Sequence, residues 1–223
     1  MPRATRAVEA GTIYHVLNRG NGRMMLFHKD EDFAAFEKVL GQGLLRYPVD
    51  LLTYCLMGNH WHLLLRPRRE RALSALMRWV GVTHVRRHHA HFRTRGGGHL
   101  YQGRFKSFPV QDDRHFLAVG RYIEANAVRA GLARDAADWT WSGFHARTAR
   151  DKPFTMASWP IERPRNWREM LNEDLPEEEL KRLRQSVNRG RPFGSEAWVE
   201  QTARRLNLQS TLRDPGRPKK NAK

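Results

Sequence analysis

Cysteine is almost absent from this sequence, because the chain of 223 residues contains only Cys55. A single cysteine excludes an intramolecular disulfide framework and is typical of a protein from a reducing compartment. Cys55 lies within the apolar run 51–57, which favours a small buried side chain over a reactive thiol.

Long apolar runs are also missing. No segment approaches the ~20 apolar residues of a membrane-spanning helix, and residues 1–6 lack the apolar region of a secretion signal. A long amphipathic helix with an extended apolar face, typical of basic proteins at membrane surfaces, is not evident either. We therefore expect a cytoplasmic protein with no membrane partner.

Acidic side chains are scarce relative to basic ones. The sequence has 23 Asp and Glu against 40 Lys and Arg, which gives a formal net charge of +17 and a pI near 11.0. Such an excess indicates an anionic partner, and nucleic acid is the usual one. A metal-dependent hydrolase of small phosphate esters would leave this charge unexplained.

One stretch combines two histidines with the side chains typical of a β-strand. Residues 58–65 read Gly-Asn-His-Trp-His-Leu-Leu-Leu, a composition that favours an extended chain. Because side chains alternate between the two faces of a strand, His60 and His62 point to the same side with their Cβ atoms about 7 Å apart. Trp61 then faces a core. Taken alone, the pair fits two ligands of one divalent ion or two partly buried histidines equally well.

Hydrophobic periodicity and turn signals predict an alternating order of strands and helices. The expected strands are 12–17, 49–57, 60–67 and 105–111, and the expected helices are 30–45 with Asp30 as N-cap, 71–92, and 112–130 with Gly131 as its stop. The resulting β-α-β-β-α-β-α order is that of a ferredoxin-like α+β sandwich, with an antiparallel sheet and helices on one face. We assign residues 1–148 to this domain and 149–223 to a partly helical, basic extension.

The helix expected at 112–130 carries a row of polar side chains beside its buried stripe. His115, Tyr122, Asn126 and Arg129 fall on one flank at positions i, i+7, i+11 and i+14. A tyrosine in such a place is often only a residue at the edge of the core, hydrogen-bonded at its tip.

Together with the two histidines, the side chains on this flank suggest a catalytic site. Tyr122 carries a phenol, which is a poor nucleophile at neutral pH unless the phosphodiester that it attacks is polarised and held in line. A divalent ion on His60 and His62 would polarise it as a Lewis acid, and the carbonyl oxygen of Asn126 is a candidate third ligand. His15 either supports this site from a neighbouring strand or is an ordinary core histidine.

Several motifs resemble those of the REP-associated tyrosine transposases, a subgroup of the single-tyrosine HUH (IS200-like) transposases. Asn-His-Trp-His-Leu-Leu at 59–64 is similar to the HUH motif, and Arg-Tyr-Ile-Glu-Ala-Asn-Ala-Val-Arg-Ala-Gly-Leu at 121–132 is similar to the tyrosine helix. The subgroup's other motifs match at 14–20, 101–107, 139–142 and 191–199. The resemblance covers nearly the whole chain. Relatives more often have Pro after the Asn, where this sequence has Ala127, and others have Gln rather than Asn as third ligand.

The resemblance implies a metal-dependent enzyme that cuts and rejoins single-stranded DNA at a hairpin-forming palindromic repeat, beside a recognition tetranucleotide. Tyr122 would form a 5′-phosphotyrosine and release a 3′-hydroxyl, with Mg or Mn on His60 and His62. The protein would act as a monomer or a homodimer and would be associated with the nucleoid. The main alternative is a regulator that binds repeat DNA or RNA on the same fold without catalysis.

We expect a set of polar and basic side chains to contact DNA, although solvated basic residues at a sheet edge are common. The candidates are Asn18, Arg19, Arg104, Lys106, Arg129, Arg189, Arg191, Arg217, Lys219 and Lys220. Those from Arg189 onward would bind the hairpin or fold back over the active site.

Overall fold

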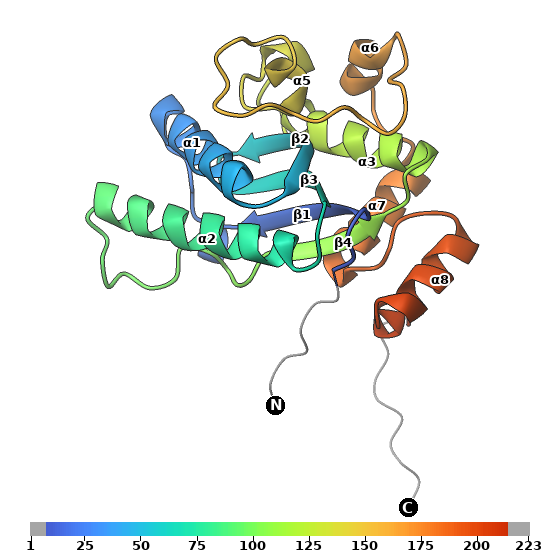
Figure 1. Cartoon of the computed structure of the whole chain (residues 1–223). Coiled ribbons are helices and arrows are strands. Elements are labelled where there is room, and N and C mark those ends of the chain that lie inside the picture. The colour runs from blue at the N-terminus through green and yellow to red at the C-terminus, as the bar shows by residue number, and fades with distance from the viewer. Residues whose placement is uncertain (1–7, 214–223) are drawn as a thin grey trace, which may run out of the picture.

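The computed structural model describes residues 8–213, which form a four-stranded sheet covered by helices (Figure 1). The strands are β1 (Ile13–Arg19), β2 (Val49–Met57), β3 (His60–Pro67) and β4 (Lys106–Val110). Every pair of neighbours is antiparallel, in the order β2-β3-β1-β4. This is the order of the ferredoxin-like sandwich predicted from the sequence.

Two long helices cover one face of the sheet (Figure 1). They are α1 (Asp30–Arg46) and α2 (Ala72–His91), and their buried side chains pack against Trp61, Leu63 and Leu65 of β3 in one core cluster. The alternation expected for β3 is therefore confirmed on this side. Within the described residues, no helix is both long and apolar enough to cross a bilayer.

The helix α3 (Arg114–Glu124) packs on the opposite face, so the prediction that the helices share one face is wrong. Its apolar side chains join Leu52, Cys55 and Leu64 in a second core cluster. The reason is visible in β2, in which all nine residues are buried. A strand that is apolar on both sides requires cover on both sides of the sheet.

The third predicted helix is divided in two. α3 ends at Glu124, and α4 (Asn126–Arg129) follows after Ala125. The predicted start is confirmed, because the Asp113 side chain accepts a hydrogen bond from the backbone N–H of His115. Gly131 ends α4 at φ +68°, the left-handed conformation that glycine adopts most readily.

The start of α1 differs by one residue from the prediction. Asp30 is the first helical residue and Lys29 is the N-cap. The carboxylate of Asp32 accepts hydrogen bonds from the backbone N–H groups of His28 and Lys29, and these bonds favour Lys29 as the cap.

The C-terminal part of the chain covers both edges of the sheet. Its elements are η2 (Ala136–Asp138), α5 (Gly143–Ala146), α6 (Trp167–Asn172), α7 (Glu177–Arg189), α8 (Glu196–Arg205) and η3 (Gln209–Thr211). Near the other end of the chain, the short helix η1 (Asn21–Arg23) follows β1. On the edge strand β2, Leu56 N–H donates to the Trp141 carbonyl. On the edge strand β4, Phe193 N–H donates to the Pro109 carbonyl. These contacts satisfy backbone groups that an open edge would expose.

The packing of α5 on β2 makes a stability prediction. A methyl group at Gly143 would overlap Thr53 Oγ1 and lie 2.9 Å from the Tyr54 nitrogen, so we expect Gly143→Ala to lower the free energy of unfolding by about 1–3 kcal/mol. Gly81 in α2 has no heavy atom within 4 Å of an added Cβ. The control Gly81→Ala should raise stability by about 0.5–1 kcal/mol. Urea denaturation measures both, and equal stability of the two variants would contradict the packing.

Candidate active site

His60 and His62 lie on the face of β3 that α3 covers, as the strand alternation predicts. Their ring centroids are 5.1 Å apart with the planes at 81°, so the two rings are close enough to share one ion. His60 Nδ1 is 2.6 Å from Asn59 Oδ1, and Asn59 Nδ2 donates to the Arg23 carbonyl. Because the amide is oriented in this way, His60 Nδ1 carries the proton and Nε2 keeps its lone pair.

His15 supports His62 from the neighbouring strand β1. Its Nε2 is 2.8 Å from His62 Nδ1, and its side chain is fully buried. When His62 Nδ1–H is the donor in this contact, His62 Nε2 is left free to bind a ligand. His15 Nδ1 has no hydrogen-bond partner among the described residues. Of the two alternatives that the sequence left open for His15, the structure favours support of the site, because His15 lies directly behind His62.

All three rings are held neutral by burial. Desolvation lowers the pKa of His15 to about 3 and, with help from the charges of Arg19 and Arg129, that of His60 to about 4. Burial, followed by the charge of His15, also lowers the pKa of His62 well below its usual range. Neutral imidazoles are the form that binds metal ions, so no proton has to leave these rings first.

Tyr122 reaches the two histidines from α3. Its side chain is 8% exposed, and its ring centroid lies 5.9 Å from that of His62 and 6.1 Å from that of His15. The tyrosine and the His pair therefore meet within one chain, although they are 60 residues apart in the sequence. The α3 stripe of Phe116, Val119 and Ile123 holds this helix against the sheet.

Arg129 occupies the centre of the same group. Its guanidinium carbon lies 4.3 Å from the centroid of the Tyr122 ring, and it donates to the Tyr122 carbonyl and to Asn126 Oδ1. Burial lowers the pKa of this guanidinium. The sequence placed Arg129 on the same flank as Tyr122 and predicted a DNA contact for it, and the structure brings its guanidinium over the Tyr122 ring.

Asn126 lies beside Tyr122 and Arg129, just after the break between α3 and α4. It is 5% exposed, and its Nδ2 has no hydrogen-bond partner among the described residues. Arginine is only a donor, so the Asn126 oxygen must face Arg129. A carbonyl oxygen has two lone pairs, and a role as third ligand therefore requires Asn126 to share this oxygen with Arg129 or to exchange it.

The donors present fit a divalent ion. Two neutral imidazoles with free Nε2 atoms suit Mn better than Mg on ligand chemistry, and the amide oxygen of Asn126 remains the predicted third donor. The described residues contain no group of three or more His, Cys, Asp or Glu side chains that could hold a metal. Water or a phosphate oxygen would therefore complete the coordination.

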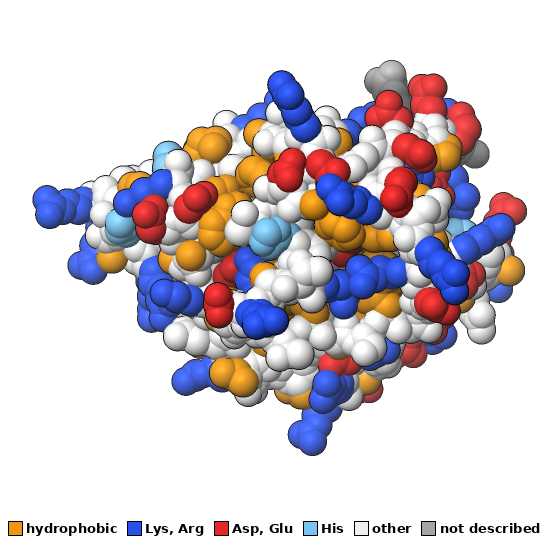
Figure 2. Space-filling model, turned by 90° about the horizontal axis from the view of Figure 1, so that it is seen from above, with side chains coloured by type: hydrophobic (Ala, Val, Ile, Leu, Met, Phe, Trp, Pro, Cys, Tyr) orange, Lys and Arg blue, Asp and Glu red, His pale blue; other side chains and the backbone are white. Residues whose placement is uncertain are grey.

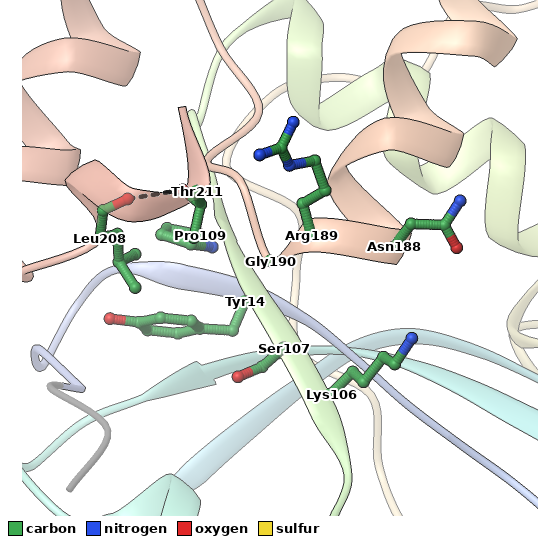
Figure 3. A pocket seen from close by; sticks show the side chains of 9 residues that line it. All are labelled: Tyr14, Lys106, Ser107, Pro109, Asn188, Arg189, Gly190, Leu208 and Thr211. Carbon is green, nitrogen blue, oxygen red and sulfur yellow. Dashed lines mark hydrogen bonds between the residues drawn. The ribbon is translucent and has the colours of Figure 1, made fainter. Parts of the chain in front are cut away.

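The remaining predicted DNA contacts lie in several places. Arg19 is opposite His60 in the register of β1 and β3, and Asn18 Nδ2 donates to the Gly103 carbonyl. Lys106 and Arg189 line one pocket of about 250 Å³ between β4 and the C-terminal elements, and their side chains leave it in different directions (Figure 3).

Two further predicted DNA contacts line other cavities, and three lie outside the described residues. Arg104 borders a groove beside α2. Arg191 lines a cavity of about 460 Å³ with Arg114 and Arg182. His115, predicted on the flank of Tyr122, borders that cavity too and pairs with Asp113. The predicted contacts Arg217, Lys219 and Lys220 are those outside the described residues.

The family model for IS200-like transposases matches residues 9–126, more than half of the 223-residue chain. The chain belongs to the IS200-like transposase family. The matched part of this transposase contains the His60 and His62 strand as well as Tyr122 and Asn126. Membership of this family establishes a transposase-type function in DNA processing.

Two solved structures are similar to this transposase. One is a REP-associated tyrosine transposase bound to a REP hairpin, with 20% identity and a TM-score of 0.51 over 67% of this chain and 87% of that chain. The other is a putative transposase from Deinococcus radiodurans R1, with 17% identity and a TM-score of 0.40 over 54% of this chain and 94% of that chain. The first likeness shows a shared fold. No curated protein matches the chain.

The neutral histidines predict an acid-sensitive transposase. The unfolded chain protonates histidine near pH 6.5, whereas native His15 stays neutral down to about pH 3. The unfolded state therefore binds more protons, and stability falls as the pH drops below about 6.5, by about 1.4 kcal/mol per pH unit for each such histidine. His15→Phe should reduce this slope between pH 6 and 4 by about 1.4 kcal/mol per pH unit, which corresponds to one proton fewer taken up on unfolding. Unfolding curves in urea at each pH measure it, and an unchanged slope would show that His15 is not buried as a neutral ring.

Proposed function

We propose that this transposase cuts and rejoins single-stranded DNA beside hairpin-forming repeats, with Tyr122 as the nucleophile. The observation that carries the proposal is the meeting of Tyr122 with His62 at 5.9 Å between ring centroids. Tyr122 also packs in the core on this face, but a buried pair of neutral histidines costs stability in acid and is not required for binding DNA. The combination therefore favours catalysis over binding alone.

The proposed reaction is a transesterification. The phenol oxygen of Tyr122 attacks the scissile phosphorus and loses its proton, while the bond from phosphorus to the 3′ oxygen breaks and that oxygen gains a proton. The products are a 5′-phosphotyrosine and a free 3′-hydroxyl. Because one phosphodiester replaces another, little free energy is lost, and a second 3′-hydroxyl can reverse the step to rejoin DNA.

Within the proposal, each residue of the site has a role. His60 and His62 would hold Mg or Mn through their Nε2 atoms, with Asn126 as third ligand, and the ion would polarise a phosphate oxygen. Arg129, above the Tyr122 ring, stabilises negative charge on the phenol oxygen and the phosphate. His15 is a positioning residue that fixes the ring of His62.

Hairpin DNA is the proposed substrate on three grounds. The net charge is +17, the motifs resemble those of REP-associated enzymes, and the similar solved structure is described as bound to a REP hairpin. Figure 2 shows Lys and Arg side chains spread over the face that bears α5 and α6, with Asp and Glu interspersed. The histidines and Tyr122 come from one chain, so a monomer is sufficient for the chemistry, and a homodimer is compatible with it.

The nucleophile has a direct test. Tyr122→Phe removes the phenol oxygen and keeps the ring over which Arg129 lies, so covalent adducts with labelled hairpin DNA and Mn should vanish while hairpin affinity stays within about twofold. Denaturing gel electrophoresis measures the adduct. The control Tyr47→Phe removes a hydroxyl at the end of α1 and should leave adduct formation unchanged. Adducts that persist in Tyr122→Phe would contradict the assignment.

The metal site can be tested without catalysis. The signal of free Mn²⁺ in electron paramagnetic resonance falls as the ion binds to the protein. We expect His60→Ala to weaken Mn affinity by at least about tenfold. His28→Ala, which removes an exposed ring near Phe92, is the control and should bind Mn like the unaltered chain. Equal Mn affinity in all three proteins would exclude His60 as a ligand.

A further inference from the structure

The helix that carries Tyr122 is enclosed by the C-terminal extension as well as by the sheet. Every residue of α3 from Ala118 to Glu124 is buried, and α6 lies beside α3 (Figure 1). At Gly120 the two parts approach closely, because an added Cβ would lie 3.2 Å from the ring of Trp159, in the segment before α6. The position of α3 therefore depends on the extension and not on the sheet alone.

Two polar side chains of α3 form directed hydrogen bonds with the extension. Arg121 and Glu124 are three residues apart and so lie on one side of the helix. The buried guanidinium of Arg121 donates to three backbone carbonyls at the end of α6. They are those of Met170 at 2.6 Å, Glu173 at 3.3 Å and Asp174 at 3.2 Å. One arginine thus fixes the end of α6 against α3.

Glu124 links α3 to α6 and to β2 at once. Its completely buried carboxylate accepts hydrogen bonds from Trp167 Nε1 at 2.8 Å and from Thr53 Oγ1. Burial raises the pKa of this carboxyl, while the two hydrogen bonds and the charge of Arg147 oppose the rise. A buried carboxylate that loses such a partner pays the full cost of its desolvation. The bonds of Glu124 therefore hold α3, α6 and β2 in one arrangement.

The place of the Tyr122 hydroxyl depends on this arrangement. The ring of Tyr122 contacts His62 and Arg129, but its hydroxyl has no hydrogen-bond partner among the described residues. The apolar stripe of α3 tolerates small shifts, because apolar contacts have no preferred direction, whereas hydrogen bonds do. Misplacement of a reacting group by about 1 Å can slow a reaction about a hundredfold.

We infer that α6 belongs to the catalytic unit, and that Arg121 and Glu124 are positioning residues that set the place of the Tyr122 hydroxyl through their bonds to it. This inference rests on the proposed function, since it assumes that Tyr122 is the nucleophile. It also extends the catalytic domain past residue 148, the boundary predicted from the sequence, to include α6.

The test removes one of these bonds and compares the result with a matched loss elsewhere. Trp167→Phe keeps an aromatic ring and deletes the N–H that donates to Glu124. The control Tyr54→Phe deletes a hydroxyl that donates at 2.6 Å to Glu37, a buried carboxylate of α1 on the other face of the sheet. Both variants lose one hydrogen bond to a buried carboxylate, so a general loss of stability affects both.

Two readouts separate positioning from folding and from DNA binding. The first is the single-turnover rate of adduct formation with saturating labelled hairpin DNA and Mn, measured beside the hairpin affinity. The second is fluorine NMR of protein that carries fluorotyrosine at its five tyrosines. In these spectra, Tyr122→Phe identifies the signal of Tyr122. This readout requires neither DNA nor catalysis.

We expect Trp167→Phe to slow adduct formation by about tenfold or more, to shift or broaden the Tyr122 signal, and to keep hairpin affinity within about twofold. Tyr54→Phe should leave the rate, the Tyr122 signal and the affinity unchanged. An unchanged rate or an unmoved Tyr122 signal in Trp167→Phe would overturn the inference. Equal slowing in the two variants would also overturn it, because lost stability would then explain the effect.

Glu124→Gln is the conservative variant that keeps the link to α6. Its amide oxygen can accept from Trp167, and the hydroxyl of Thr53 can accept from its amide N–H. We expect adduct formation within about threefold of the unaltered rate. A loss equal to that of Trp167→Phe would assign the effect to the charge of Glu124 instead of its bond to α6, and would overturn the inference.

The two proposals fail in different ways. If adducts form on Tyr122 at the same rate in the unaltered chain and in Trp167→Phe, the positioning inference alone is wrong. If no adduct forms in the unaltered chain, while the Tyr122 signal moves in Trp167→Phe and not in Tyr54→Phe, α6 positions Tyr122 and the catalytic proposal is wrong.

Discussion

Burial of the sheet on both faces is the constraint from which the candidate site follows. α1 and α2 cover one side, and the apolar residues of β2 on the other side require α3 as a second cover. Because α3 packs there, Tyr122 is brought next to His62, which strand alternation had already turned to that face. Packing alone thus joins a strand and a helix that are far apart in the sequence, and the C-terminal elements stabilise the arrangement by covering both sheet edges.

The bounds of the strands and of the long helices could be predicted closely from the sequence. For β2 and β3, the reason is a strong apolar pattern with a Gly-Asn turn between the two strands. The prediction missed the second covered face, although the unbroken apolar run of β2 was a usable signal. The break at Ala125 could not be predicted, since alanine favours helix and the break depends on tertiary contacts. The sequence placed Arg129 on the flank of Tyr122, but its contacts with the Tyr122 ring and with Asn126 could not be predicted, because they depend on how α4 turns after the break.

Electrostatics connects the small site with the whole protein. Around the site, burial keeps three histidines neutral while Arg129 supplies positive charge beside Tyr122. Beyond it, the sequence between Glu70 and Asp112, which includes α2, contains no acidic residue. Both regions therefore carry positive charge that suits the proposed DNA substrate.

The central claim is that Tyr122 itself becomes linked to DNA. Trypsin cleavage after Arg121 and Arg129 would release the peptide 122–129, which contains a single tyrosine. Mass spectrometry of the digested protein–DNA adduct should find the 5′-phosphonucleotide on this peptide, attached to the phenol oxygen. A nucleotide on any other residue, or an unmodified 122–129 peptide in a protein that has cut its hairpin substrate, would contradict the account.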